Sequence, residues 1–176
     1  SRLLPRPRLL AALVAGVLAA AGAHAADDPD KLPADPPRHP VLDPHYGDVL
    51  FEFYQGRYFA AITKLEVSQH FERMQHHADE AEILRGGLLL SYGMHRQATE
   101  VFEALLARGA APSVRDRAWY FLAKIRYQRG LLPEASDALG RIGHVLPEPL
   151  EDDRKLLQAN VAMALGDNVG ASRILE

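Results

Sequence analysis

Apolar residues recur every three or four positions along the chain, and this helical spacing is clearest in residues 116–147. Leu122 and Ala123 follow Trp119 by three and four positions, so the three side chains share one face of a helix. Gly130 interrupts the pattern, because glycine is a poor helix former. These residues predict one short helix that ends near Gly130.

A second apolar stripe follows this glycine. Pro133 suits the first turn of a helix, because its missing N–H group would have no partner there. Ala135, Leu139 and Ile142 then recur every three or four residues, and Pro147 ends the stripe. The whole stretch therefore predicts a hairpin of two short helices.

The turn between these two helices has a sequence pattern that recurs along the chain. A glycine is followed two positions later by a residue that is usually bulky, and five positions later by an alanine. The pattern occurs at Gly56, Tyr58, Ala61; Gly93, His95, Ala98; Gly130, Leu132, Ala135; and Gly166, Asn168, Ala171. The intervals between the glycines are 37, 37 and 36 residues. A single hairpin cannot bury its apolar faces alone, so the repetition predicts an array of hairpins.

The clearest unit resembles the tetratricopeptide repeat. The matching positions are Trp119, Leu122, Ala123, Ala135, Leu139 and Pro147. Arg126 stands where the signature has an aromatic residue, and Tyr127 lies next to it. The resemblance implies an all-α right-handed superhelix, or α-solenoid, of three complete hairpins and a truncated fourth. The expected units are about 45–74, 79–109, 113–147 and 150–176.

The register of the first helix in the second unit has two alternatives. Counting back from the turn glycine puts Glu82 and Arg85 on the buried face. A shift of one residue puts there Ile83, Gly86, Gly87 and Leu90 instead. We prefer the shifted register, because burying two unpaired charges is costly. The two glycines would then mark a close approach of two helices.

Polar residues predict where the first helix of the third unit begins. Ser113 and Asp116 have the spacing of a capping box, in which side chains bind the free N–H groups of the first turn. We therefore expect Asp116 to lie in the first turn of that helix.

The first 25 residues have the pattern of a secretory signal peptide. Arg2, Arg6 and Arg8 precede an apolar run over residues 9–23, and Ala25 completes a small-residue cleavage site. The alternative is a membrane anchor, but about 15 apolar residues fall short of the roughly 20 that span a bilayer. We expect cleavage after Ala25, no membrane span in the mature chain, and a periplasmic or secreted protein of a Gram-negative bacterium.

Residues 26–44 contain six prolines and several aspartates, which predicts an extended tether. A proline-rich ligand for a partner domain is the alternative. Removal of the signal peptide leaves 17 basic residues against 23 acidic ones, a formal charge of −6 that argues against nucleic-acid binding. The first residue is Ser, and residue 176 falls inside an expected helix, so we expect a fragment of a longer protein.

The sequence contains no recognisable catalytic motif. Cysteine is absent, which excludes a disulfide framework, a thiolate zinc site and a cysteine nucleophile. His76 and Glu80 stand four apart, next to His77, and suggest a metal-binding alternative with an incomplete ligand set. We expect no enzymatic activity in this region, no cofactor and no metal.

The resemblance further implies a concave groove, lined by the first helix of each unit, in which segments of other proteins bind. The groove residues that it implies are Tyr46, Leu50, Phe53, Tyr54, Arg117, Tyr120, Lys124, Tyr127, Gln128, Asn160 and Met163. Arg117 and Lys124 would form a basic spot that favours an acidic segment or a terminal carboxylate. For Phe53 and Tyr127, packing between hairpins is an equal alternative.

The leading functional hypothesis is a scaffold or adaptor of the cell envelope that binds partner proteins in this groove. A second hypothesis is the N-terminal repeat domain of a larger exported enzyme, or of a component of secretion or polysaccharide export. A metal-storing or metal-sensing protein is the third.

Overall fold

The computed structural model describes residues 41–148 and 150–175, and within these ranges the chain is all-helical, with no strand. The helices are α2 Pro44–Tyr54, α3 Tyr58–His70, the short 3-10 helix η1 Gln75–His77, α4 Ala78–Ser91, α5 His95–Ala107, α6 Pro112–Gln128, α7 Leu132–Gly140, α8 Leu150–Ala164 and α9 Asn168–Leu175. The expected all-α class is confirmed. The expected signal peptide and residues 26–40 of the expected tether lie outside the described residues.

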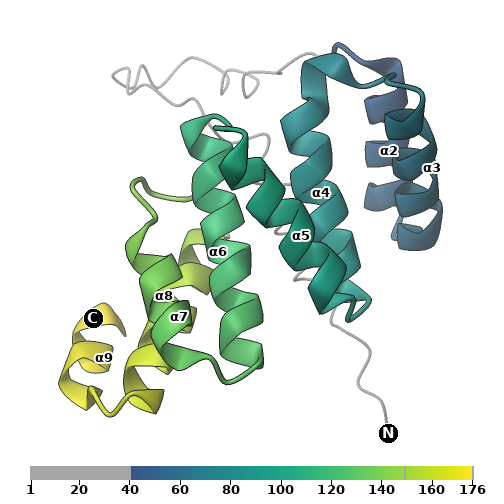
Figure 1. The fold of residues 1–176 in the computed structure, drawn as a ribbon. Coiled ribbons are helices and arrows are strands. Elements are labelled where there is room, and N and C mark those ends of the chain that lie inside the picture. The colour runs from purple at the N-terminus through teal and green to yellow at the C-terminus, as the bar shows by residue number, and fades with distance from the viewer. Residues whose placement is uncertain (1–40, 149, 176) are drawn as a thin grey trace, which may run out of the picture.

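Consecutive helices pack in pairs: α2 with α3, α4 with α5, α6 with α7, and α8 with α9 (Figure 1). Each pair is joined by a short turn that contains one of the repeated glycines. Their φ angles are positive: 72° at Gly56, 76° at Gly93, 75° at Gly130 and 87° at Gly166. Residues with a β-carbon rarely adopt this conformation, which explains why glycine recurs at this position. The prediction that every repeated glycine joins two paired helices is confirmed.

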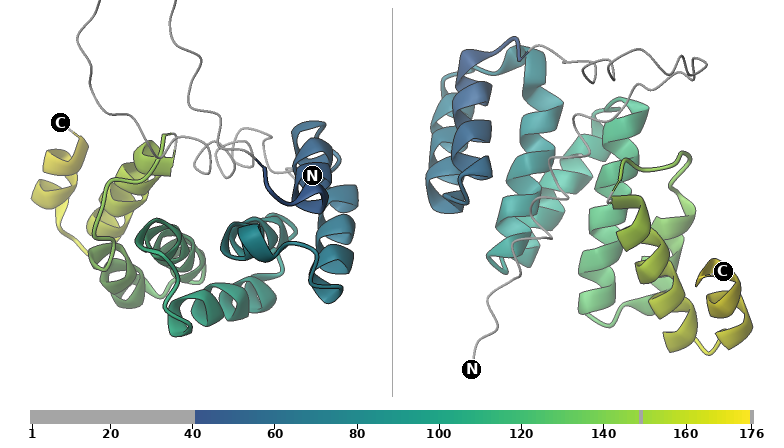
Figure 2. Two further views of the ribbon diagram at one scale, coloured as in Figure 1. Left: turned by 90° about the horizontal axis from the view of Figure 1, so that it is seen from above. Right: turned by 180° about the vertical axis from the view of Figure 1, so that it is seen from behind.

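The four hairpins follow one another along a curve (Figure 2). Seen from above, α4 and α6 lie on its inner side, and α5 and α7 lie on its outer side. The pair α2 and α3 occupies one end of the curve, and α8 and α9 occupy the other. The first helices of successive pairs therefore line a shared concave face, and α6 contacts both α4 and α8 along it.

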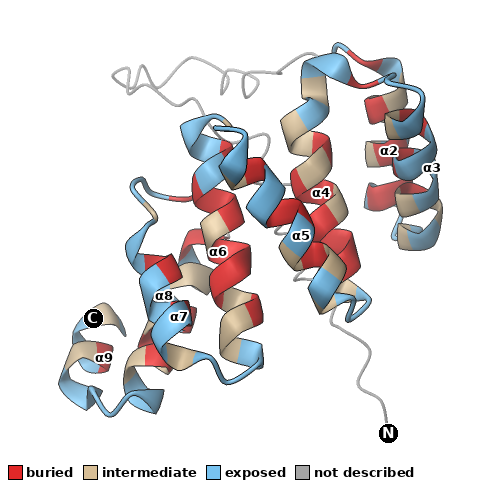
Figure 3. Ribbon diagram, in the orientation of Figure 1, coloured by how far each residue is buried: buried red, intermediate tan, exposed pale blue. Residues whose placement is uncertain are grey.

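The core runs through the hairpins, and its buried positions concentrate along α4, α5 and α6 (Figure 3). Phe102 of α5 stacks on Phe121 of α6 with ring centroids 5.1 Å apart. The shifted register for the second unit is confirmed at three of its four positions, because Ile83, Gly86 and Gly87 are buried. Leu90 is half-buried.

The other register, counted back from the turn glycine, would have buried Glu82 and Arg85. In the structure these two residues lie at the edge of the core. They form an ion pair there, with Arg85 Nη2 2.9 Å from Glu82 Oε2. Glu82 also accepts a hydrogen bond from Gln69 Nε2 of α3. Their charges are therefore paired at the junction between the first and second hairpins.

The expected capping box at the start of the third unit is wrong. Helix α6 begins at Pro112, after Ala111, and no side chain caps its first turn. Ser113 therefore lies inside the helix, and Asp116 lies further along it. Because the helix starts early, the Asp116 carboxylate is free to bind a loop that is distant in sequence.

That carboxylate holds the linker between α7 and α8. It accepts hydrogen bonds from His144 Nδ1 at 2.8 Å, His144 N at 3.1 Å and Gly143 N at 3.3 Å. Asp116 is almost completely buried. This single side chain therefore fixes the approach of the fourth hairpin to the third.

Asp43 plays the same part between the first and second hairpins. Its carboxylate accepts hydrogen bonds from His76 Nδ1 at 2.9 Å and His77 N at 3.0 Å. The neighbouring Leu42 N donates to His77 Nε2 at 3.0 Å. The last residues of the expected tether are thus fixed against η1 and form part of the folded array.

Candidate protein-binding groove

A pocket of about 220 Å³ opens between α6 and α8, the first helices of the third and fourth hairpins. Five residues predicted for the groove line it: Tyr120, Lys124, Tyr127, Gln128 and Asn160. Asp153, Leu156 and Leu157 of α8 complete its wall. The structure therefore brings predicted residues from two repeats around one opening.

The spacing of the α6 residues explains their convergence. Lys124 and Gln128 follow Tyr120 by four and eight positions, so their side chains project from one side of the helix. Asn160 faces them from α8. Aromatic surface together with amide and ammonium donors is typical of sites that bind a polypeptide segment.

Charge in the pocket is concentrated on Lys124 and Asp153. Burial lowers the pKa of Lys124, and the nearby Asp153 carboxylate only partly opposes this shift. The Lys124 ammonium lies 5.9 Å from the centre of the Tyr120 ring. Burial raises the pKa of Tyr120, and Asp153 raises it further. A partly buried cation whose charge is incompletely compensated would be stabilised by an incoming anion.

Arg117 differs from its expected place on an accessible surface. Only 3% of the residue is exposed, because it lies in the interior of α6, where the first helices of the array meet. Its Nε donates to Ser113 O at 3.1 Å, while Nη1 has no hydrogen-bond partner among the described residues. Burial lowers the pKa of Arg117, and Glu80 and Tyr46 oppose that shift. Arg117 and Tyr120 therefore do not form, with Lys124, the exposed basic and aromatic surface that was predicted.

The predicted residues of the first hairpin are divided. Tyr46 and Phe53 are fully buried, which supports the packing alternative for Phe53. Leu50 is half-buried and packs against the core, as does Tyr127 of the third hairpin. Tyr54 is exposed. None of the first-hairpin residues borders the pocket between α6 and α8.

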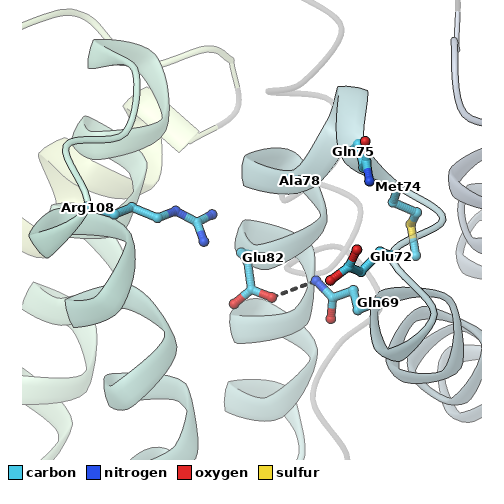
Figure 4. A pocket seen from close by; sticks show the side chains of 7 residues that line it. All are labelled: Gln69, Glu72, Met74, Gln75, Ala78, Glu82 and Arg108. Carbon is cyan, nitrogen blue, oxygen red and sulfur yellow. Dashed lines mark hydrogen bonds between the residues drawn. The ribbon is translucent and has the colours of Figure 1, made fainter.

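A second pocket of about 220 Å³ lies where the end of α3, the start of α4 and the end of α5 meet (Figure 4). Two of its charged side chains, those of Glu82 and Arg108, have partners within the chain. Gln69 Nε2 donates to Glu82 Oε1 at 2.5 Å, and Arg108 Nη2 lies 2.5 Å from Asp79 Oδ1. Arg108 is the one cation among the described residues that line this pocket, and it is already paired, so the pocket suits an acidic ligand less well than the pocket around Lys124.

The histidines of the metal-binding alternative have structural contacts. His76 binds Asp43, and the His77 ring stacks on Tyr46 with centroids 4.7 Å apart. In the part of the chain that the structure describes, no group of three His, Cys, Asp or Glu residues is placed to hold a metal ion. The described residues also include no helix long and apolar enough to cross a membrane.

Sequence reasoning missed Asp153, Leu156 and Leu157 in the pocket, and Asp43, Asp79 and Asp116 in the linkers. The three linker aspartates stand 36 and 37 residues apart, almost the same interval as the turn glycines. Asp43 and Asp116 bind the linkers that follow the first and third hairpins, at His77 and His144. Asp79 binds Arg108, at the end of the second helix of the second hairpin. The repeat period was therefore a signal that could have identified these aspartates.

Comparison with protein-family models, with curated proteins and with solved structures finds no match to this chain.

Proposed function

We propose that this chain is a protein-binding scaffold of the cell envelope, built as a tetratricopeptide-like right-handed superhelix. Four hairpins at intervals of 37, 37 and 36 residues support this proposal. The first helices of the hairpins lie on the inner side of the curve, where an extended partner segment can contact several units at once (Figure 2).

The observation that carries the proposal is the pocket between α6 and α8. Lys124, Gln128 and Asn160 border it from two repeats, and their side chains supply hydrogen-bond donors. Tyr127 and Leu156 add apolar surface to the same wall. The apolar surface would bind a side chain of a polypeptide in the groove, and the donors would form hydrogen bonds with its polar groups.

The partner segment is acidic or ends in a free carboxylate. Lys124 supplies the ammonium group in the pocket, and burial disfavours its charged form. A carboxylate of the partner would stabilise that charged form by pairing with it, which adds to the binding free energy. Asp153 disfavours a second anionic group on the α8 side. The segment should therefore carry one well-placed carboxylate rather than a dense acidic run.

A charge reversal at Lys124 tests this proposal. The protein and its Lys124→Glu variant would be immobilised and exposed to an envelope extract of the source cell and to acidic peptides with free or amidated C-termini. Arg129→Glu is the matched control, because Arg129 is exposed just beyond α6 and does not border the pocket. Arg117→Glu is unsuitable, because it would bury a carboxylate and threaten the fold.

We expect Lys124→Glu to lose the partner and the peptides, and Arg129→Glu to keep them. Loss of binding on amidation alone would identify a terminal carboxylate as the recognised group. If folded Lys124→Glu retains every partner, the partner binds elsewhere on the array.

Export rests on the signal-peptide pattern of residues 1–25. The N-terminus of the protein purified from its cell would be determined by mass spectrometry. We expect it at residue 26, and an intact N-terminus would contradict export with cleavage.

A further inference from the structure

Exposed apolar side chains gather at the four hairpin turns. We call the residues within three positions of each turn glycine the turn edge, which comprises residues 53–59, 90–96, 127–133 and 163–169. These windows span 28 of the 134 described residues, yet they hold eight of the 16 large apolar side chains that are exposed. Single exposed apolar residues are ordinary on a protein surface, but such a concentration indicates an interaction surface.

The four turns lie along one edge of the array, and the linkers between hairpins lie along the opposite edge (Figure 1). The first helix of each pair runs towards the turn edge, and the second helix runs away from it. Every hairpin therefore contributes to the same surface.

Neighbouring hairpins do not cover the turn edge. The second and third hairpins have a described hairpin on both sides, and Tyr92, Met94 and Leu131 in their turns are still 50%, 40% and 37% exposed. Phe59, in the turn of the first hairpin, is 76% exposed. The residues equivalent to Phe59 are exposed in each of the other three hairpins: Arg96, Pro133 and Val169. The exposure of the turn edge is thus a property of the repeat and does not depend on which hairpins precede or follow.

The turn edge is also basic, although the chain is acidic. It carries Arg57, Arg96 and Arg129, and Asp167 is the one carboxylate in its four windows. The described residues as a whole hold 15 Lys and Arg against 18 Asp and Glu. Arg57 and Arg96 each pair with one glutamate, yet their side chains are 55% and 79% exposed. The first three turns therefore present one accessible guanidinium group each beside their apolar side chains.

We infer that the turn edge docks on the surface of an anionic lipid bilayer. Its apolar side chains enter the interface, where tyrosine is favoured because it combines an apolar ring with a polar hydroxyl group. Its arginines pair with lipid phosphate groups. A protein partner would need a complementary surface around each protruding side chain, whereas lipids rearrange around it. Separate apolar side chains on four turns, each of the first three beside an arginine, therefore fit a bilayer.

Docking by this edge leaves the groove accessible. The first helices run towards the turn edge and lie on the inner side of the curve, so the groove opens sideways when the turns rest on a bilayer (Figure 2). Lys124 lies six positions before its turn glycine, outside the turn edge. Lipid docking and binding of a partner segment can therefore occur together, and each can be tested without the other.

The test uses single cysteines that carry an environment-sensitive fluorophore, which the absence of native cysteine makes specific. Met94→Cys and Leu131→Cys place the label on the turn edge. Phe71→Cys and Val145→Cys are the matched controls, because both residues are exposed and apolar and lie in linkers on the opposite edge. Each labelled chain is mixed with vesicles of phosphatidylcholine, with and without phosphatidylglycerol, and circular dichroism confirms that it is folded.

We expect the labels at residues 94 and 131 to brighten with phosphatidylglycerol vesicles and to be quenched by lipids that carry a quencher in their acyl chains. The labels at residues 71 and 145 should not respond, which separates docking by the turn edge from lipid contacts of the rest of the chain. No response at residues 94 and 131 overturns the inference. So does an equal response at the control positions, or an equal response to both kinds of vesicle.

Charge reversal tests the arginines in the labelled Met94→Cys chain. Arg129→Glu should weaken binding to phosphatidylglycerol vesicles about tenfold. Arg173→Glu is the control, because Arg173 is exposed seven positions after its turn glycine, outside the turn edge, and the net charge changes equally. Equal weakening by the two variants overturns the inference. Lys124→Glu should still dock, so a failure of partner binding in the groove can be told apart from a failure of lipid docking.

Discussion

The ring of Phe102 lies against the backbone of Gly86 so closely that a β-carbon on the glycine would come within 2.5 Å of the ring atom Cζ. Phe102 is fully buried and stacked on Phe121, so its ring has little freedom to move away. The close approach of α4 and α5 therefore depends on the missing side chain at residue 86.

Replacement of this glycine tests that dependence. Gly86→Ala should lower the free energy of unfolding by about 1–3 kcal/mol, despite the better helix propensity of alanine, because the added methyl group overpacks the core. Gly140→Ala is the control: Gly140 is the last residue of α7, and nothing lies within 4 Å of an added β-carbon there. Urea titration would measure both, and equal stability of the two variants would refute the argument.

Asp116 should be the most sensitive linker residue. Asp116→Ala removes the acceptor for two backbone N–H groups and for His144 Nδ1, so unfolding should become easier by about 3 kcal/mol. Asp137→Ala removes an exposed pair with Arg141 and should change stability by less than about 0.5 kcal/mol. Hydrogen exchange should show faster opening of residues 143–148 only in the first variant.

Glu151 links the stability of the array to acid. Burial raises the pKa of Glu151, but hydrogen bonds from Arg154 and from Leu146 N outweigh burial and hold the pKa below its usual value. A depressed pKa in the folded state contributes stability above the unfolded value of about 4.3, and this contribution is lost as the pH falls through the folded pKa.

Thermal unfolding of the protein and of Glu151→Gln should therefore differ most at neutral pH. The gap between their melting temperatures should narrow as the pH falls below about 4. A gap that stays constant down to the acid limit would show that Glu151 stabilises the fold by packing alone.

Trp119 packs at the interface of α6 and α7, where the Arg141 guanidinium lies 4.9 Å from the centre of its ring. It is half-buried, so Trp119→Ala should cost about 2–3 kcal/mol, less than the 3–5 kcal/mol of a fully buried tryptophan. Denaturant unfolding checks the value. Trp119→Phe, which keeps a ring for Arg141, should recover about half of the loss.

Local signals in the sequence were sufficient to predict the helical class, the four hairpins and the places of their turns. Glycine is needed at a positive φ angle wherever a helix must end in a tight turn, so its spacing reveals the period directly. The resemblance to the tetratricopeptide repeat implied the groove positions of Lys124 and Gln128, and their spacing agrees with it, because residues four apart on a helix share a side.

The burial of Arg117, the partner of Asp116 and the contribution of Asp153 to the pocket were decided only by the tertiary structure. Each depends on which helix lies opposite, and that is set by contacts between residues more than 25 positions apart, such as Asp116 with His144. The same local sequence pattern is compatible with a polar side chain that faces water, a loop or a neighbouring repeat. The packing of successive hairpins chooses among these environments, because only it determines which surfaces lose contact with water.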